Sequence, residues 1–337
     1  MTTNRFPLFR LPFLALCEIL DFNGPHEVIQ LLLCSKQGLR VAKKCWRKQE
    51  KVKADVSADI VPTVNLYFYD AAFYYRFAIL EAKDLQDELT HNVRVGDAVV
   101  PSIHKDTETV TYWDDKIIGI EQVVRHINDL FDVPITSVDL KSEEYENEFI
   151  DTMDCIMSRQ ESVQDYTLHA EDFTEECLTH LLDSCKITGE LRIYGEPTRQ
   201  FRNDWNIHLD SIYISNGSSL TFQNLTNINC KSLELYRSIL TSEDVNQFLK
   251  DWQNGEHSCM RYISIDINSM DHDIIKSGIE TVPQPETQHK VYPLMRNSSI
   301  VRSGGLDIMS KDGRTGTIYL VDDSFGFGVD PIEVFSD

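Results

Sequence analysis

The sequence has no long hydrophobic run and no closely paired cysteines, and these absences limit the classes of protein that it can represent. No stretch of about 18 or more uncharged apolar residues occurs, so we expect no transmembrane helix. The apolar opening FPLFRLPFLALCEIL (6–20) is interrupted by Arg10, Pro12 and Glu18 and has no small-residue cleavage site, unlike a secretory leader. The eight cysteines form no CxxC pair, which predicts reduced thiols, a cytoplasmic or nuclear location, and neither zinc nor another cofactor.

Net positive charge is also lacking, except at the beginning of the chain. The formal net charge is −22, from 32 Lys and Arg against 54 Asp and Glu. Residues 1–53 hold 10 basic and 4 acidic residues, so the remaining chain holds 22 against 50 and carries −28. An acidic body of this kind repels phosphate backbones and anionic lipids. We therefore expect no nucleic-acid or membrane partner, and a protein partner that is basic or neutral.

Short amphipathic segments at the N-terminus predict three helices within about fifty residues. Leu11-Pro12 begins the first helix, because proline suits the first helical position. Asn23-Gly24-Pro25 separates it from the apolar second helix, VIQLLLC (28–34), and the basic segment 35–53 forms the third. A unit of this size cannot bury all of its apolar surface internally. The surface either packs on the following domain or meets a partner protein.

Between residues 135 and 267, short segments of alternating apolar character return every 21 to 30 residues. Their first inward positions are Val138, Tyr166, Leu191, Ile212, Leu233 and Ile263. Helical patterns at 173–185 and 241–255 precede the third and the sixth of these strands. One strand and one helix or loop in each unit are typical of a leucine-rich-repeat-like solenoid, here a degenerate one, and a compact α/β domain with a parallel sheet is the alternative.

These patterns also predict the domain boundaries. Residues 1–50 form the helical unit, 51–60 a linker, 61–134 a β-rich flank, 135–270 the repeats, and 271–337 a terminal loop and β-hairpin cap. The hairpin turns at Lys311-Asp312-Gly313, because Asp-Gly between alternating segments favours a tight turn. The stretches GGLD (304–307) and GFGVD (326–330) are interpreted as hairpin corners.

Side chains between the inward positions of a strand point to its opposite face. If the register above is correct, these outward side chains are exposed and are candidates for substrate contact: Asp139, Thr167, Arg192, Tyr213 and Glu234. Aromatic and arginine side chains are the preferred anchors in such a set.

Catalytic motifs are scarce. His208 with Asp210 and His272 with Asp273 place an imidazole beside a carboxylate, as metal and acid–base sites often do, but neither pair has a second histidine four residues away. No GxSxG elbow and no phosphate-binding glycine loop is present. We therefore expect a protein that is not an enzyme, and an enzyme with its site at these four residues is the alternative.

The N-terminal pattern resembles an F-box over residues 6–46. It has Leu-Pro, an Ile-Leu pair seven residues later, an apolar second helix and a Cys-Ser-Lys junction, although Phe13-Leu14 stands where an acidic pair often follows the proline. The resemblance implies docking to a Skp-type adaptor and through it to a cullin scaffold. The implied adaptor contacts are Leu11, Pro12, Leu14, Ile19, Leu20, Leu31 and Ser35.

The acidic body resembles the F-box-associated C-terminal domain of a large nematode-expanded family, through residues 239–265 and 304–321. That domain is thought to hold substrate. The resemblance implies the substrate-recognition subunit of an SCF-type ubiquitin ligase, with an α/β fold that joins a small three-helix F-box to a degenerate leucine-rich-repeat-like β/α solenoid with β-rich flanks. A protein-interaction module without ligase coupling is the alternative function.

Overall fold

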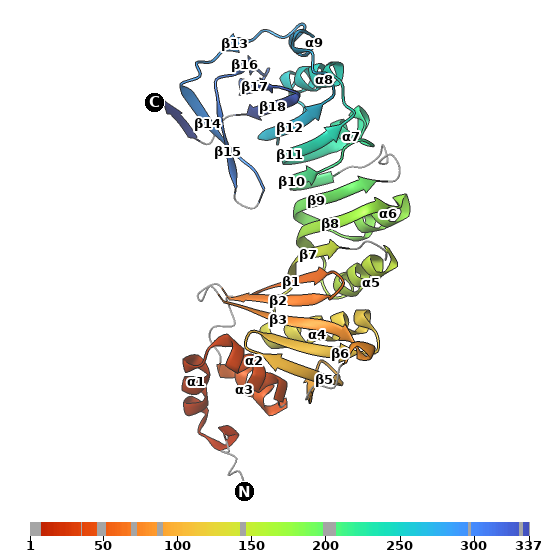
Figure 1. Cartoon of the computed structure of the whole chain (residues 1–337). Coiled ribbons are helices and arrows are strands. Elements are labelled where there is room, and N and C mark those ends of the chain that lie inside the picture. The colour runs from red at the N-terminus through yellow and green to blue at the C-terminus, as the bar shows by residue number, and fades with distance from the viewer. Residues whose placement is uncertain are drawn as a thin grey trace. The chain divides into compact units, whose positions relative to one another are not determined.

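The computed structural model of the chain describes residues 8–34, 36–45, 52–68, 73–85, 90–141, 146–197, 207–295, 298–329 and 333–336. The chain forms two compact units, Met1–Val163 and Gln164–Asp337. Both units are mixed α/β and rich in strands (Figure 1), so the expected α/β class is confirmed. No helix within the described ranges is long and apolar enough to cross a lipid bilayer.

The first unit begins with short helices. They are η1 (Leu8–Arg10), α1 (Phe13–Phe22), α2 (Pro25–Cys34) and α3 (Lys36–Cys45). Pro12 takes the cap position before α1, one residue ahead of the place predicted for it. Leu16 and Leu20 of α1 and Ile29 of α2 are buried. Both α1 and α2 pack against α3, and α2 also packs against β4 (His91–Val95), so part of the apolar N-terminal surface packs on the rest of the unit.

A mixed sheet follows these helices, with its described strands in the order β7-β1-β2-β3-β6-β5-β4. The strands not yet given are β1 (Val52–Ala58), β2 (Thr63–Phe68), β3 (Phe73–Glu81), β5 (Ala98–Lys105), β6 (Glu108–Trp113) and β7 (Ile135–Lys141), with η3 (Ala82–Asp84) after β3. Residues 51–60 were expected to be a linker, but β1 pairs antiparallel with β2 and parallel with β7. Ala54 and Val56 of β1 are buried, because alternation along VKADVSA gives this strand an apolar face.

Two helices follow the β-rich part of the first unit. α4 (Lys116–Phe131) begins after Asp115, whose carboxylate accepts the N–H groups of Ile117 and Ile118 at 2.7 and 3.3 Å. It covers β2, β3 and β6, and α5 (Glu146–Met157) packs against it. α4 also contacts α3, so the N-terminal helices adjoin the same layer.

The second unit contains a larger sheet with the order β13-β16-β17-β18-β12-β11-β10-β9-β8. Its first strands are β8 (Val163–Phe173), β9 (Ile187–Pro197), β10 (Ile207–Ile214), β11 (Ile228–Ser238) and β12 (Tyr262–Ile267). The helices are α6 (Glu175–Ser184), α7 (Phe222–Asn227), α8 (Ser242–Gln253) and α9 (His272–Lys276). The strands β9, β10, β11 and β12 pair in parallel with their neighbours in the chain, as the repeating pattern predicted.

The predicted register of these strands is confirmed. Leu191 pairs with Ile212, Ile212 with Leu233, and Leu233 with Ile263, and all four side chains are buried. The other inward positions, Val138 and Tyr166, are buried as well. Figure 1 shows α6 and α7 on one side of the strands, and we call the opposite side of β8–β11 the open face. On that side of β12, Tyr262 is buried under Tyr292 of β14.

The helix α8 fixes the closing strands to the parallel ones. It begins with a capping box between Thr241 and Asp244 and ends before Gly255, which has a φ of 102°. Trp252 of α8 is fully buried and meets Phe327 edge to face, with 4.9 Å between ring centroids. The start and end of this helix agree with the sequence pattern.

The remaining strands complete the large sheet and form a second, three-stranded sheet. They are β13 (Val282–Pro283), β14 (Gln288–Pro293), β15 (Ser299–Ser303), β16 (Leu306–Met309), β17 (Thr315–Val321), β18 (Ser324–Val329) and β19 (Glu333–Ser336), and β15-β14-β19 make the second sheet. The hairpin predicted at Lys311-Asp312-Gly313 joins β16 to β17. The GFGV part of the GFGVD stretch is not a corner, because residues 326–329 lie in β18, where a Cβ on Gly328 would come within 2.3 Å of the Tyr292 ring. Asp330 lies outside the described residues.

Candidate functional site

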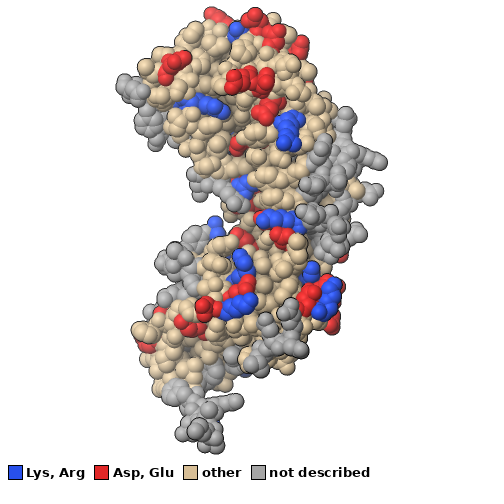
Figure 2. Space-filling model, viewed as in Figure 1, with Lys and Arg blue, Asp and Glu red and all other residues tan. Residues whose placement is uncertain are grey.

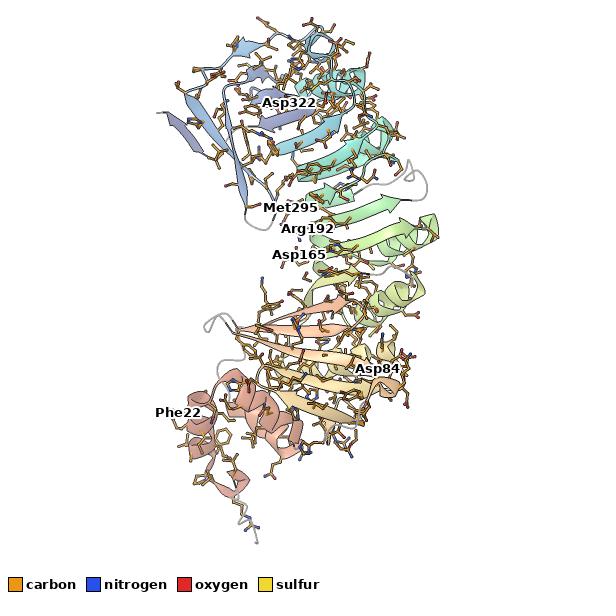
Figure 3. The ribbon with its side chains drawn as sticks, viewed as in Figure 1. Phe22, Asp84, Asp165, Arg192, Met295 and Asp322 are labelled. Carbon is orange, nitrogen blue, oxygen red and sulfur yellow. The ribbon has the colours of Figure 1, made fainter. Side chains whose placement is uncertain are left out.

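Among the side chains that the structure describes in the N-terminal helices, the most exposed apolar ones lie on α1. Leu14 is 76% exposed, Phe22 is 91% exposed, and Phe13 is 52% exposed. Leu14 and Phe22 are eight residues apart and therefore share one side of the helix, where Figure 3 labels Phe22 at its end. Exposed apolar groups that gather on one element mark a contact site for another protein.

The structure separates the implied adaptor contacts into accessible and inaccessible side chains. Leu20 is buried, so its side chain is not accessible to a partner. Ser35 lies outside the described residues. The others are exposed (Pro12, Leu14) or half-buried (Leu11, Ile19, Leu31). Sequence reasoning missed Phe22, although its eight-residue spacing from Leu14 would have indicated it.

Three of the predicted substrate-contact residues form one row on the open face of the second unit. Arg192 of β9 pairs directly with Tyr213 of β10, and Tyr213 pairs with Glu234 of β11. Thr167 lies on β8 of the same unit. Asp139 lies on β7 of the first unit, where its carboxylate is 3.8 Å from the ammonium group of Lys141.

The exposure predicted for the five substrate-contact side chains is only partly correct. Tyr213, Glu234 and Asp139 are half-buried, but Thr167 and Arg192 are buried, with 4% and 6% exposed. The guanidinium of Arg192 forms an ion pair with Glu190, its neighbour on the same strand face. Strands about 4.8 Å apart crowd long side chains of one face against each other, so an outward position need not be an exposed one.

A row of aromatic rings also crosses the open face. Tyr213 belongs to both rows, whereas His169, Tyr194 and Tyr236 stand two residues beyond Thr167, Arg192 and Glu234. His169, Tyr194, Tyr213 and Tyr236 come from β8, β9, β10 and β11. The centroids of successive rings are 4.5, 5.0 and 5.4 Å apart, and the interplanar angle is 8° for the first pair and 41° and 45° for the others. Sequence reasoning named only Tyr213, although the other three stand at outward positions of the same alternation.

Carboxylates lie beside this aromatic row. The Tyr236 hydroxyl donates a hydrogen bond to Glu234 at 3.4 Å. Burial first, and then the carboxylates of Glu234 and Asp266, raise the pKa of Tyr213 and Tyr236, the latter to about 12. Burial also raises the pKa of Glu234. The hydroxyls therefore stay protonated, and the open face near Tyr236 is a region of negative potential.

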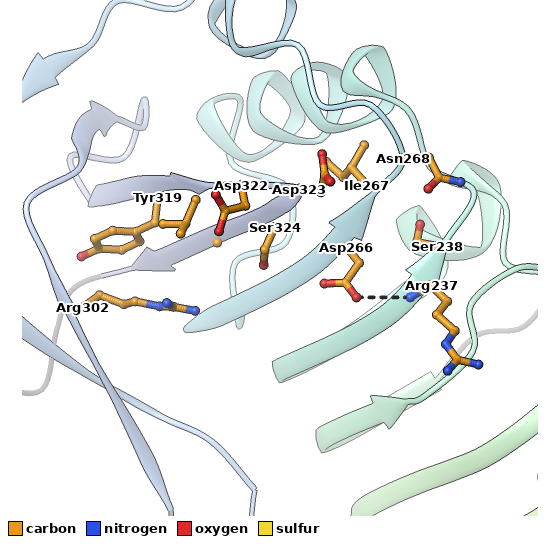
Figure 4. A pocket seen from close by; sticks show the side chains of 12 residues that line it. Arg237, Ser238, Asp266, Ile267, Asn268, Arg302, Tyr319, Asp322, Asp323 and Ser324 are labelled. Carbon is orange, nitrogen blue, oxygen red and sulfur yellow. Dashed lines mark hydrogen bonds between the residues drawn. The ribbon is translucent and has the colours of Figure 1, made fainter.

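The aromatic row ends beside a pocket of about 480 Å³ between the ends of β11, β12, β15 and the β17–β18 turn (Figure 4). Asp266, Asp322 and Asp323 line it together with Arg302, whose guanidinium donates to the Tyr262 hydroxyl at 2.9 and 3.1 Å. Asp266 accepts the backbone N–H of Arg237 at 3.4 Å. Arg237 also lines the pocket, so three carboxylates stand against two guanidinium groups (Figure 4).

The residues nominated for catalysis do not come together. Asp210 forms an exposed ion pair with Lys231 at 2.6 Å, and Asp273 pairs with Lys276 at 3.2 Å within α9. His208 lines a second pocket of about 480 Å³, apart from His272 at the start of α9. In the part of the chain that the structure describes, no group of three or more His, Cys, Asp and Glu side chains is arranged to hold a metal ion.

Charged side chains of both signs lie on the visible surface of each unit. Figure 2 shows Asp and Glu interspersed with Lys and Arg on the visible face of each unit, without a continuous basic patch among the coloured residues. The second unit, residues 164–337, contains 27 acidic and 14 basic residues.

The comparisons with known proteins fall on this second unit and on the chain as a whole. Residues 200–265, which contain Tyr213, Glu234 and Tyr236, match the model of a family described as F-box associated. The chain is 19% identical over 335 residues to an uncharacterized protein of Caenorhabditis elegans, covering 94% of this chain and 74% of that protein. It is 20% identical over 302 residues to the Skn-1 dependent zygotic transcript 15 protein of the same organism, covering 83% and 84%. No solved structure matches the chain.

Proposed function

We propose that the chain is the substrate-recognition subunit of an SCF-type cullin-RING ubiquitin ligase. The match of residues 200–265 to the F-box-associated family carries this proposal. In this role residues 1–50 act as an F-box that binds a Skp-type adaptor, and the second unit binds a protein substrate on its open face. The parallel β/α units of the second unit then correspond to degenerate leucine-rich-repeat-like repeats, and the chain works in the cytoplasm or the nucleus.

The exposed side of α1 supports the adaptor half of the proposal. Burying one large apolar side chain in an interface is worth about 1.5–3 kcal/mol. Leu14 and Phe22 together would supply roughly 3–6 kcal/mol before the costs of association, against about 8 kcal/mol for a micromolar complex. The half-buried Ile19 and Leu31 would add area at the edge of this contact.

The chain has no catalytic role in this proposal. A receptor of this kind raises the effective concentration of substrate near the active centre of another subunit. The separation of His208 from His272 and the exposed ion pairs of Asp210 and Asp273 support a binding role rather than an enzymatic one.

The test is capture of a purified Skp-type adaptor by the full-length chain. We expect a Leu14→Ala, Phe22→Ala variant to capture it at least about tenfold more weakly, because both contacts would be lost. Ile60→Ala with Val301→Ala is the matched control, since both of these apolar side chains are also exposed. Circular dichroism should show the same fold in all three proteins, because none of the four side chains is in a core.

Failure of the full-length chain to capture any Skp-type adaptor would overturn the ligase role. The chain would then act as a protein-interaction module without ligase coupling. Equal capture by the α1 variant and the control would instead show that the adaptor does not bind through the exposed side of α1.

A further inference from the structure

We propose that the open face of the second unit binds a cationic segment of a partner protein, whose Lys and Arg side chains lie on the aromatic row His169–Tyr194–Tyr213–Tyr236 and enter the acidic pocket next to it. The description of this partner as a ubiquitination substrate rests on the proposed function, whereas the surface itself does not.

The first argument is the form of the aromatic row. Each ring lies within 5.4 Å of the next, so the row presents an almost continuous strip of aromatic edges and partial faces across four strands. The tilts of 41° and 45° leave parts of the Tyr194, Tyr213 and Tyr236 faces uncovered by their neighbours. Electron-rich tyrosine faces attract guanidinium and ammonium groups. The chain already uses this contact elsewhere, with Arg76 over Tyr74 at 5.8 Å.

The second argument is charge complementarity along the row. Glu234 is half-buried beside Tyr236, and its nearest cation on the face, Arg192, is already paired with Glu190. Asp266 interacts electrostatically with both Tyr213 and Tyr236 and also lines the pocket. The row and the pocket are therefore one continuous surface, with carboxylates at its side and at its end.

The third argument is the pocket itself. Its volume of about 480 Å³ exceeds what one long side chain needs, and Asp322 and Asp323 stand exposed at the two-residue turn between β17 and β18. Arg302 donates to the Tyr262 hydroxyl and Arg237 also lines the pocket, so three carboxylates outnumber two guanidinium groups there. The surplus of acidic groups repels an anionic peptide or nucleic acid and attracts a basic segment.

The experiment is selection of binding peptides from a phage library of random dodecapeptides on the immobilised full-length chain. We expect the recovered peptides to be enriched in Lys and Arg over the starting library. Binding of a recovered peptide should weaken about tenfold for Tyr236→Ala with Asp266→Asn, and should weaken as salt is raised. Asp266→Asn keeps the acceptor for the Arg237 N–H, so the strand end is preserved.

Two controls keep the outcome interpretable. Tyr67→Ala removes an exposed sheet tyrosine of the first unit and should leave binding unchanged. Asp322→Asn with Asp323→Asn removes charge only, and asparagine tolerates the φ of 51° at position 322, so a folded variant is expected with binding weakened several-fold. Recovered peptides without a basic bias, unchanged binding in the row variants, or no enrichment at all would overturn the proposal.

This result is independent of adaptor binding. The Leu14→Ala, Phe22→Ala variant should retain the peptides, and the Tyr236→Ala, Asp266→Asn variant should retain the adaptor. Loss of peptide selectivity with intact adaptor capture would reject the cationic partner alone, whereas loss of adaptor capture with intact peptide binding would reject the ligase role alone.

Discussion

Trp252 is the side chain whose removal should most clearly test how the second unit is held together. It comes from α8, is fully buried, and meets Phe327 of β18 edge to face at 4.9 Å. The Arg314 guanidinium lies over the indole ring, 5.4 Å from its centroid. The indole N–H has no hydrogen-bond partner among the described residues, so the contribution of Trp252 comes from packing and ring contacts.

The magnitude follows from these contacts. Truncation of a buried tryptophan to alanine costs about 3–5 kcal/mol in the free energy of unfolding, and the lost ring pair accounts for about 0.5–1.5 kcal/mol of this effect. Trp252→Phe keeps an aromatic ring and breaks no hydrogen bond, so we expect a smaller loss of about 1–2 kcal/mol.

Urea unfolding monitored by circular dichroism measures both variants without relying on the fluorescence of the residue removed. A loss of about 4 kcal/mol at a slope of about 2–3 kcal/mol per molar should lower the midpoint by roughly 1.3–2 M. Hydrogen exchange should speed up first in α8, β12 and β18. A loss below about 1 kcal/mol for Trp252→Ala, or equal losses for the two variants, would refute the packing argument.

Two further predictions concern the same region. Thr241→Ala removes one half of the capping box with Asp244 and should lower the free energy of unfolding by about 1 kcal/mol, measured by urea unfolding, with Thr241→Ser as the control that restores it. Burial lowers the pKa of His257 below the ordinary histidine value of about 6.5, despite the opposing charges of Glu256 and Asp251. Because the unfolded chain then binds a proton that the folded chain does not, stability should fall as the pH drops through about 6.5, by at most about 1.4 kcal/mol per pH unit. His257→Asn should show a weaker dependence of stability on pH between pH 7 and pH 5.5, measured by thermal unfolding. Asparagine is chosen because it tolerates the φ of 50° at this position. Parallel curves of stability against pH for the two proteins would contradict the assignment to His257.

The register of the second unit could be predicted because its strands alternate strictly. Leu191, Ile212, Leu233 and Ile263 are apolar positions between polar ones, and a shift by one residue would expose all of them. Burial of Arg192 could not be predicted in this way. Alternation assigns a side chain to a face, but the neighbouring strands of that face decide how much of it meets water.

The strand β1 shows why long-range pairing was missed. Val52–Ala58 is short and follows a basic helical segment, and its partner β7 begins at Ile135, far along the chain. Nothing local indicates that partner. In the same way, Gly326 and Gly328 were interpreted as marks of a turn. Glycine is needed at position 328 because the Tyr292 ring lies against it, and that ring comes from a separate strand that nothing local indicates.

The candidate site was predictable in kind but not in detail. Leu14 was named from a helical pattern, whereas Phe22 was missed because it adjoins the chain break at Asn23. Tyr213 was named as an outward residue, but the ring contacts that join it to Tyr194 and Tyr236 depend on the pairing of strands.

The parallel register of β9–β12 has a consequence for how the open face could change over generations. The core depends on one set of strand positions, represented by Leu191, Ile212 and Leu233, while the open face depends on the residues between them. Substitutions at Tyr213 or Glu234 can therefore alter what is recognised without disturbing the helices behind the sheet. Because each parallel strand from β8 to β11 contributes one side chain to the aromatic row, gain or loss of one strand with its helix would lengthen or shorten that row by a single strand spacing and leave the other side chains aligned.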